Sequence, residues 1–448
     1  MNTGSDNQST THYLMHNHAI IAQTSDATLT VEQSLGLSGE SQLVGAKNAV
    51  LVIIASLILT EGISVLTNVP CSDDVLQMID LLRDLGAHII FYADKNTLEV
   101  DTRFITSYKV NPIIMKKMRA SILVMGPLLA RFSRAEIALP GGCAIGDRPI
   151  DFHIKNFEKM NVDYTIDGDF LIGVTKKLKP TTLVLEYPSV GATENLMMAA
   201  ALTSGVTRII NAALEPEVLD LITVLRLMGA HIEILPPATI EIHGVAALLP
   251  VKHHVMHDRL EAGALLLAAA VTGGMVSLPQ ADATLMEVFL LKLQEMGHSL
   301  LIGPAGKGIT LHATKQPRAV SFATGPYPGF PTDLQASMMA VQCLAEGKSV
   351  IHETVFENRF LHVRELQKMG AQITVNGDRV VVTGVDALYG ASVIATDIRA
   401  SCALVLAGLA AKGTTVMTGI HHWKRGYESL EKKLALLGAN IILKKTTS

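Results

Sequence analysis

A glycine-rich loop at residues 139–149 carries a single cysteine, Cys143, and has the composition of a reactive site. The glycines on both sides of the cysteine allow backbone conformations that other residues avoid, and they leave the thiol accessible at a loop tip. Arg148 follows shortly after the sulfur, and a nearby cation favours the thiolate. An isolated free cysteine is more often buried and inert. Glycines and arginine together favour an accessible, reactive thiol.

Five cations are placed to bind a multiply anionic ligand. Most of them stand at the start of an alanine-rich segment, where free helix N–H groups and the helix dipole attract anions. These cations are Lys47, Arg119, Arg148, Arg399 and Arg425. One carboxylate, Asp333, holds an equivalent position. Taken singly, such residues are also explained as helix caps, solvated loops or helix-surface ion pairs. Together they favour a sugar nucleotide or a phosphorylated acid as ligand.

Motifs for the common phosphate and hydrolase chemistries are absent from the sequence. It contains no GxxxxGK[ST] loop, no GxGxxG after a strand and no GxSxG turn. Phosphate recognition without a nucleoside-triphosphate motif points to transfer of a group other than phosphoryl. The histidines have no zinc-ligand spacing, so we expect neither a metal nor a cofactor.

Length and composition exclude several classes of protein. A chain of 448 residues predicts two domains. Its longest apolar runs are too short to cross a bilayer, which argues against a membrane protein. A net charge of −4, no basic block and a single Trp argue against nucleic-acid binding. Four dispersed cysteines without a CxxC pair suit the reducing cytoplasm. We expect residues 1–27 to be a disordered polar tail without signal-peptide features.

A helix-ending phrase recurs about every 70 residues and marks a repeated unit. It occurs at residues 82–89, 225–232, 293–297, 366–371 and 434–439, with a degenerate copy at 157–162. The glycine in each phrase is typical of a helix C′ position, and a strand follows it. The predicted unit is β-α-β-α-β-β, with one helix apolar on all sides and therefore buried. Six units predict an α/β fold of two lobes, three units each, sheets outward, with a boundary near residues 246–257.

Seven phrases resemble the UDP-N-acetylglucosamine enolpyruvyl transferases. They lie at residues 45–49, 140–146, 188–193, 330–333, 354–360, 396–401 and 425–428, in consistent order along the chain. The resemblance runs from about Leu29 to the C-terminus. It implies the family fold, a two-lobed inside-out α/β barrel. It also implies that residues 46–256 form the lobe with the Cys143 loop, that residues 28–45 and 257–448 form the other lobe, and that the active site lies in the cleft between them.

The resemblance implies a reaction and its substrates. The family transfers the enolpyruvyl group of phosphoenolpyruvate to the 3-hydroxyl of UDP-N-acetylglucosamine, releases phosphate and begins peptidoglycan precursor synthesis. It implies a cytoplasmic enzyme that is sensitive to thiol-alkylating inhibitors of the fosfomycin type. The substrates are the only partners expected: neither nucleic acid nor a membrane is implied, and no oligomer is predicted.

Residue roles are carried over by motif. Catalytic roles fall to Cys143 as acid or nucleophile, to Asp333 as general base, and to Lys47 and Arg425. The phosphoenolpyruvate site is implied to contain Lys47, Asn48, Arg119, Arg148, Arg399 and Arg425. The UDP-N-acetylglucosamine site is implied to contain Asn48, Arg119, Arg148, Pro149, Asp151, His153, Ser189, Val190, Gly191, Asp333, Val355 and Arg359. The sequence departs from the family pattern at Asp147, Tyr187 and Trp423, and none of these replaces a catalytic group.

Two other hypotheses about the function remain open. The first is an enolpyruvyl transferase of the same fold that uses shikimate 3-phosphate; the cysteine loop and the phrase at 189–191 count against it. The second is a catalytically silent binding or regulatory paralogue. Loss of Cys143, Asp333 or Arg425 would be its signature, and all three are present.

Overall fold

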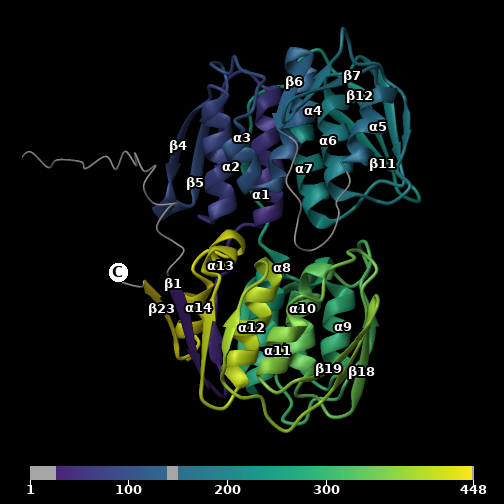
Figure 1. Ribbon diagram of the computed structural model, residues 1–448. Helices are drawn as coiled ribbons and strands as arrows, with labels where there is room; N and C mark the ends of the chain where they lie inside the picture. Colours follow the sequence, from purple (N-terminus) through teal and green to yellow (C-terminus); the bar gives the residue numbers. More distant parts are fainter. Residues whose placement is uncertain (1–26, 139–149, 446–448) are drawn as a thin grey trace, which may run out of the picture.

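The computed structural model describes residues 27–138 and 150–445, without the side chains of residues 116, 117, 119 and 445. Cys143, Arg148 and Pro149 therefore lie outside the described residues. The chain forms two halves, one above the other in Figure 1. The upper half contains α1 to α7 and the lower half α8 to α14.

The strands of the upper half form three sheets within the described residues, two with four strands and one with three. In spatial order the first sheet is β13 (Lys252–His254), β3 (Ile63–Thr67), β5 (Thr97–Asp101) and β4 (His88–Tyr92). The second is β6 (Arg134–Ala138), β8 (Phe170–Val174) and β7 (Asp163–Asp167). The third is β11 (His231–Leu235), β12 (Thr239–Gly244), β10 (Gly205–Ile210) and β9 (Thr182–Val184). In place of a fourth strand, β6 has a single parallel bridge between Lys109 and Glu136.

The lower half has three sheets of four strands in the same part of the chain that the structure describes. The first is β15 (Ser299–Ile302), β16 (Lys307–His312), β14 (Met275–Asp282) and β2 (Ser38–Glu40). The second is β17 (Phe322–Ala323), β18 (Lys348–His352), β20 (Arg379–Thr383) and β19 (Gln372–Asn376). The third is β21 (Ser392–Ile394), β22 (Thr414–Thr418), β1 (Ala27–Glu32) and β23 (Ile441–Lys445). Each sheet joins one parallel pair to antiparallel neighbours.

Apolar helices fill the centre of each half, and the sheets lie outside them (Figure 1). In the lower half α8, α10 and α12 pack against one another, as predicted for helices without a polar face. The buried side chains form two hydrophobic clusters, one from residues 46–255 and one from residues 27–43 and 260–441. The helices of the upper half are α1 (Lys47–Ser56), α2 (Asp73–Asp84), α3 (Pro112–Lys117), α4 (Met125–Phe132), α5 (Asp151–Lys159), α6 (Val190–Ala201) and α7 (Pro216–Leu227). Those of the lower half are α8 (Arg259–Thr272), α9 (Glu287–Glu295), α10 (Thr332–Gln342), α11 (Val363–Lys368), α12 (Ile398–Ala410), α13 (Ile420–Gly426) and α14 (Leu430–Leu436).

The chain crosses between the halves twice, at residues 44–46 and 256–258. Before the first crossing, β1 lies between β22 and β23, so the first and last described segments share a sheet of the lower half. The two crossings pair with each other through an antiparallel bridge between Gly45 and His257. A Cβ on Gly45 would lie 1.8 Å from the carbonyl oxygen of Asn68, so only glycine fits this crossing.

The repeated helix-ending phrase adopts the conformation that its glycine predicts. The φ angles of Gly86, Gly229, Gly297, Gly370 and Gly438 are positive and range from 95° at Gly370 to 111° at Gly86. In the degenerate copy Asn161 takes φ 74°, and asparagine is the residue that tolerates this region best after glycine. The predicted C′ positions are therefore confirmed.

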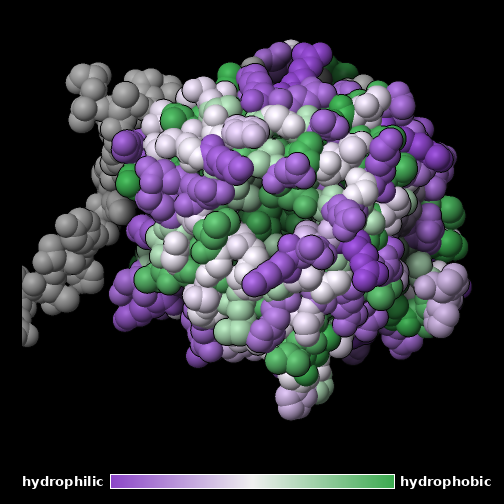
Figure 2. All heavy atoms as spheres, turned by 90° about the horizontal axis from the view of Figure 1, so that it is seen from below, coloured by the Kyte–Doolittle hydropathy of each residue, from purple (hydrophilic) through white to green (hydrophobic). Residues whose placement is uncertain are grey.

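The mixed α/β class is confirmed, while the six sheets remain open among the described residues. On the face seen from below, hydrophobic residues are interspersed with polar ones (Figure 2). Within residues 27–138 and 150–445, no helix has both the length and the apolar character needed to cross a membrane.

Candidate active site

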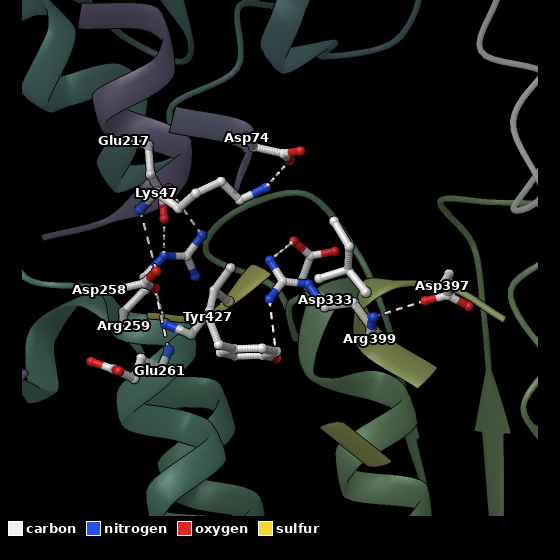
Figure 3. A network of polar contacts seen from close by, with 12 residues as sticks. Lys47, Asp74, Glu217, Asp258, Arg259, Glu261, Asp333, Asp397, Arg399 and Tyr427 are labelled. Carbon is white, nitrogen blue, oxygen red and sulfur yellow. Dashed lines mark hydrogen bonds and ion pairs between the residues drawn. The ribbon is translucent and has the colours of Figure 1, made fainter. Parts of the chain in front are cut away.

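Helix N-termini from both halves meet at the junction shown in Figure 3. In agreement with the predicted helix starts, α1 begins at Lys47, α10 at Thr332 and α12 at Ile398. The dipoles of these helices favour negative charge at their N-terminal ends. The junction therefore combines helix ends with three of the cations that the sequence singles out, Lys47, Arg399 and Arg425.

Asp333 is held by two arginines near the start of α10. Its Oδ1 lies 2.5 Å from Nη2 of Arg359, and its Oδ2 lies 2.7 Å from Nη2 of Arg399. Both guanidinium groups are buried, whereas a quarter of the Asp333 side chain is exposed. The carboxylate is therefore fixed by buried cations and still reachable from outside.

The surroundings of Asp333 strongly favour its ionised form. Burial alone raises the pKa of the Asp333 carboxyl, but the charges of Arg399 and Arg359 outweigh burial and hold that pKa well below its usual range. Lys47 acts in the same direction from the upper half. In this state both carboxylate oxygens are occupied, and Asp333 is a weak base.

Aromatic side chains fix Arg399 from below. Its Nη1 donates to the hydroxyl oxygen of Tyr427 at 3.3 Å, and the guanidinium lies over the same ring. Trp423, one of the departures from the family pattern, is buried against Tyr427 with ring centroids 5.1 Å apart. Its indole N–H donates to Glu431 at 2.8 Å. Trp423 thus packs beneath the site and supports Arg399 through Tyr427.

Asp74, near the start of α2, joins two further cations across the junction. Its Oδ2 lies 3.3 Å from Nζ of Lys47, and its Oδ1 accepts from Nε of Arg425 at 2.8 Å. Lys47 on α1 and Asp74 on α2 belong to the upper half, and Arg425 belongs to α13 of the lower half (Figure 1). One buried carboxylate therefore brings together two of the predicted site cations.

A second ion pair links the halves at the starts of α7 and α8. Nε and Nη2 of Arg259 donate to the two carboxylate oxygens of Glu217 at 3.0 and 3.2 Å. Asp258 caps α8 by accepting from the backbone N–H groups of Leu260 and Glu261. For Asp258 the helix-cap interpretation considered from the sequence is therefore sufficient.

Glu353 organises the loop that contains Val355. Its Oε1 accepts from the backbone N–H groups of Val355 and Phe356 at 2.9 and 3.2 Å. Its Oε2 accepts from the hydroxyl of Thr332 at 2.9 Å, directly before Asp333 in the chain. A single buried carboxylate thus ties this loop to the start of α10.

Four of the residues predicted for the UDP-N-acetylglucosamine site meet on the upper half. His153 is buried on α5, and its Nδ1 lies 3.2 Å from Nδ2 of Asn195. A Cβ on Gly191 would lie 3.7 Å from the His153 ring, so the ring packs close to the start of α6. Ser189 caps α6 by accepting from the N–H of Ala192. The structure brings His153, Ser189, Val190 and Gly191 together.

Other predicted residues are placed only in part. Asn48 is half-buried and follows Lys47 on α1, and Asp151 is exposed as the first residue of α5. For Arg119 the structure gives the backbone, at the start of a 3-10 turn, and no side chain. Cys143, Arg148 and Pro149 lie outside the described residues, as stated above.

Three carboxylates of the site were missed as functional residues in the sequence. Asp74 and Glu217 stand in charged loops that the repeats align, at residues 70–74 and 215–217, so the repeat pattern offered a signal for both. Glu353 has no comparable signal, because its acceptor role depends on backbone groups of a loop that forms only in the fold.

Comparisons with known proteins agree with this geometry. Residues 31–434 match the family described as EPSP synthase (3-phosphoshikimate 1-carboxyvinyltransferase). The UDP-N-acetylglucosamine 1-carboxyvinyltransferase of Geobacter metallireducens is 44% identical over 413 residues, 92% of this chain and 98% of the relative. UDP-N-acetylglucosamine 1-carboxyvinyltransferase 1 of Caldanaerobacter subterraneus is 47% identical over 415 residues, 92% of this chain and 99% of the relative.

Solved structures of low identity show the same fold. The enolpyruvyl transferase NikO from Streptomyces tendae superposes with a TM-score of 0.86 at 24% identity, covering 94% of this chain and all of its own. EPSP synthase from Acinetobacter baumannii gives a TM-score of 0.73 at 17% identity, covering 93% of this chain and all of its own. Together with the family match over residues 31–434, this places the chain in the class of the carboxyvinyl (enolpyruvyl) transferases.

Within that class, the identity to the curated relatives decides the family. The chain belongs to the family of UDP-N-acetylglucosamine 1-carboxyvinyltransferases. The resemblance stated from its motifs is confirmed.

Proposed function

We propose that this chain transfers the enolpyruvyl group of phosphoenolpyruvate to the 3-hydroxyl of UDP-N-acetylglucosamine and releases phosphate, as the first committed step of peptidoglycan precursor synthesis. The observation that carries the proposal is the pairing of Asp333 with Arg359 and Arg399, all three at positions that match the family motifs. This pairing supports Asp333 as the base, because its carboxylate stands among buried cations that suit an anionic donor.

The reaction balances as an addition followed by an elimination. The sugar oxygen bonds to C2 of the donor while its C3 methylene gains a proton, which gives a saturated carbon bearing both oxygens. Loss of a proton from C3 and cleavage of the bond between C2 and the phosphate oxygen then restore the double bond. Asp333 takes the hydroxyl proton, and Cys143 supplies the proton to C3 or bonds covalently to the donor.

The anionic donor lies among the cations of the junction. Lys47, Arg425 and Arg399 bind its phosphate and carboxylate, together with Arg119 and Arg148. Support comes from the burial of Lys47 and Arg399 and from the helix N-termini beside them, which raise the affinity for anions. A quarter of the Arg425 side chain is exposed, so this cation is accessible to a ligand.

Binding of the donor makes Asp333 a competent base. When Arg399 turns to the donor's carboxylate, it releases Oδ2 of Asp333 and removes one of the charges that lower the pKa of this carboxyl. The free oxygen then accepts the 3-hydroxyl proton of the sugar, which Asn48 helps to orient.

The acceptor's nucleotide lies against the starts of α5 and α6. Asp151, His153, Ser189, Val190 and Gly191 line it from the upper half. Val355 and Arg359 approach from the lower half, and Arg148 and Pro149 complete the set. The close packing of His153 on Gly191 supports this assignment.

The two halves are the lobes of an inside-out α/β barrel fold with three units each. Residues 46–256 form one lobe and residues 28–45 with 257–448 the other, with the site between them. The two hydrophobic clusters and the place of β1 between β22 and β23 support this division. The dispersed cysteines support a cytoplasmic location.

Phosphate release tests the proposal. Wild-type protein and Cys143→Ala are assayed with phosphoenolpyruvate and either UDP-N-acetylglucosamine or shikimate 3-phosphate. We expect release with the sugar nucleotide alone, lost or strongly reduced in the variant. Release with shikimate 3-phosphate alone would refute the proposed acceptor, and binding of the sugar nucleotide without release would favour the silent paralogue.

A further inference from the structure

Asp74 satisfies two cations that lie on opposite sides of the junction. Each of its carboxylate oxygens serves one of them: Oδ2 lies 3.3 Å from Nζ of Lys47, and Oδ1 lies 2.8 Å from Nε of Arg425. The side chain is 5% exposed, so water does not replace either contact. The carboxylate stands in the first turn of α2, where the helix dipole favours its charge.

The contacts of the Asp74 carboxylate resemble those of a bound anionic ligand. Two cations from different elements converge on separate oxygens of one buried carboxylate, as they would on a carboxylate or phosphate of a ligand. Lys47 and Arg425 are also the cations that the proposed function assigns to the anionic donor. The same two cations therefore have two possible partners, Asp74 and the donor.

We propose that Asp74 is a positioning residue of the donor site, which holds Lys47 and Arg425 toward each other and yields them to the anionic group of the donor. The inference rests on the proposed function for the role of these two cations. Without the donor, Asp74 keeps the cations ordered and neutralised. With the donor bound, an oxygen of its phosphate or carboxylate takes over at least one of the two contacts.

Asp74→Asn separates positioning from a purely structural role. Asparagine keeps the size of the side chain and an acceptor for Arg425, but it loses the charge that competes for Lys47. We expect inorganic phosphate to bind about tenfold more tightly, the change that loss of one charge-assisted contact corresponds to. We expect kcat to fall at the same time, because Lys47 is no longer held. A residue that only supported the fold would weaken phosphate binding when replaced.

The affinities are measured by titrating the protein with inorganic phosphate and with phosphoenolpyruvate. The recorded signal is the fluorescence of Trp423, which lies on α13 with Arg425. Asp74→Glu keeps the charge and should bind phosphate as weakly as the wild type. The matched control is Asp80→Asn on the same helix, where the carboxylate forms an exposed pair with Arg83. It should change neither affinity nor kcat.

Two results would overturn the inference: unchanged or weaker phosphate binding in folded Asp74→Asn, or an unchanged kcat in the variant when the wild type transfers the enolpyruvyl group. If Asp74→Asn does not fold, Asp74→Ser carries the same expectation. The phosphate titration does not depend on turnover. Tighter phosphate binding in the variant of a protein that transfers no enolpyruvyl group would keep the inference and refute the proposed function. If the wild type transfers the enolpyruvyl group normally and the variant has unchanged phosphate affinity, the proposed function is kept and the inference about Asp74 is refuted.

Discussion

Replacing Asp333 by asparagine tests the centre of the proposed site, because the change removes one charge and keeps the shape of the side chain. Removing one partner of a buried ion pair costs about 3–5 kcal/mol. The asparagine oxygen still accepts from one guanidinium, and a quarter of the side chain faces solvent, so we expect the lower end, about 3 kcal/mol. For halves of roughly 200 residues this corresponds to a Tm lower by about 6–12 °C. The variant therefore folds and is less stable.

Loss of the proposed base should have a separate effect on the rate. General-base catalysis contributes about 10²- to 10⁴-fold, so kcat of Asp333→Asn should fall by at least 100-fold at saturating substrates. Phosphate release measures kcat, and calorimetric titration with UDP-N-acetylglucosamine verifies that the acceptor still binds. The matched control is Asp378→Asn in the same half, which removes an exposed carboxylate paired with His352 and should leave kcat unchanged. Near-normal turnover in Asp333→Asn would remove this residue as the base.

Three further predictions concern stability and are measured by urea unfolding. Arg259→Met should lower the free energy of unfolding by about 3–5 kcal/mol, because it leaves buried Glu217 without its cation. The double variant Arg259→Met with Glu217→Leu should recover most of this stability. Equal losses in the single and double variants would contradict the prediction. Burial, with repulsion from Glu217 and Glu215, raises the pKa of the Glu194 carboxyl in the folded protein. The protonated form therefore contributes stability that is fully present below the unfolded pKa of about 4.3. This contribution is lost as the pH rises through the folded pKa. Glu194→Gln should therefore be more stable than the wild type at pH 8 and not at pH 4, whereas exposed Glu233→Gln should show no such difference. Gly229→Ala should lower the free energy of unfolding by about 1–2 kcal/mol, because the φ angle of 107° strains a residue with a Cβ. No described atom lies within 4 Å of the added Cβ, so a steric clash does not contribute. An unchanged stability would contradict the strain argument.

Local features of the fold could be predicted from the sequence because their causes are local. A left-handed C′ residue needs glycine or asparagine wherever the helix ends, so the phrase around Gly229 predicts its own conformation. The start of α12 after Asp397 has a local cause in the same way, because the Asp397 side chain accepts from the N–H groups of Arg399 and Ala400. Repetition then extends these local rules to whole units.

Strand partners distant in sequence could not be predicted from the residues alone. β1 pairs with β22 and β23 at the other end of the chain, and its own alternation of buried and exposed residues fits many possible neighbours. The second unit also has a single bridge at Lys109 where the other units have a strand. Both features depend on how complete units pack, which periodicity does not encode.

The site shows the same division between local and distant information. The sequence identifies the cations, since helix starts and family motifs mark Lys47, Arg399 and Arg425. It does not identify their partners: Asp74 and Arg425 are 351 residues apart in the chain and meet only when the halves meet. A buried cation is costly without a counter-charge, so a fold that gathers such cations must also supply carboxylates. In the proposed donor site, an anionic substrate would therefore exchange partners with Asp74 and Asp333 rather than add charge to an unpaired site. The binding free energy would then be the difference between two sets of ion pairs, so the carboxylates, as well as the cations, would set the affinity for the donor.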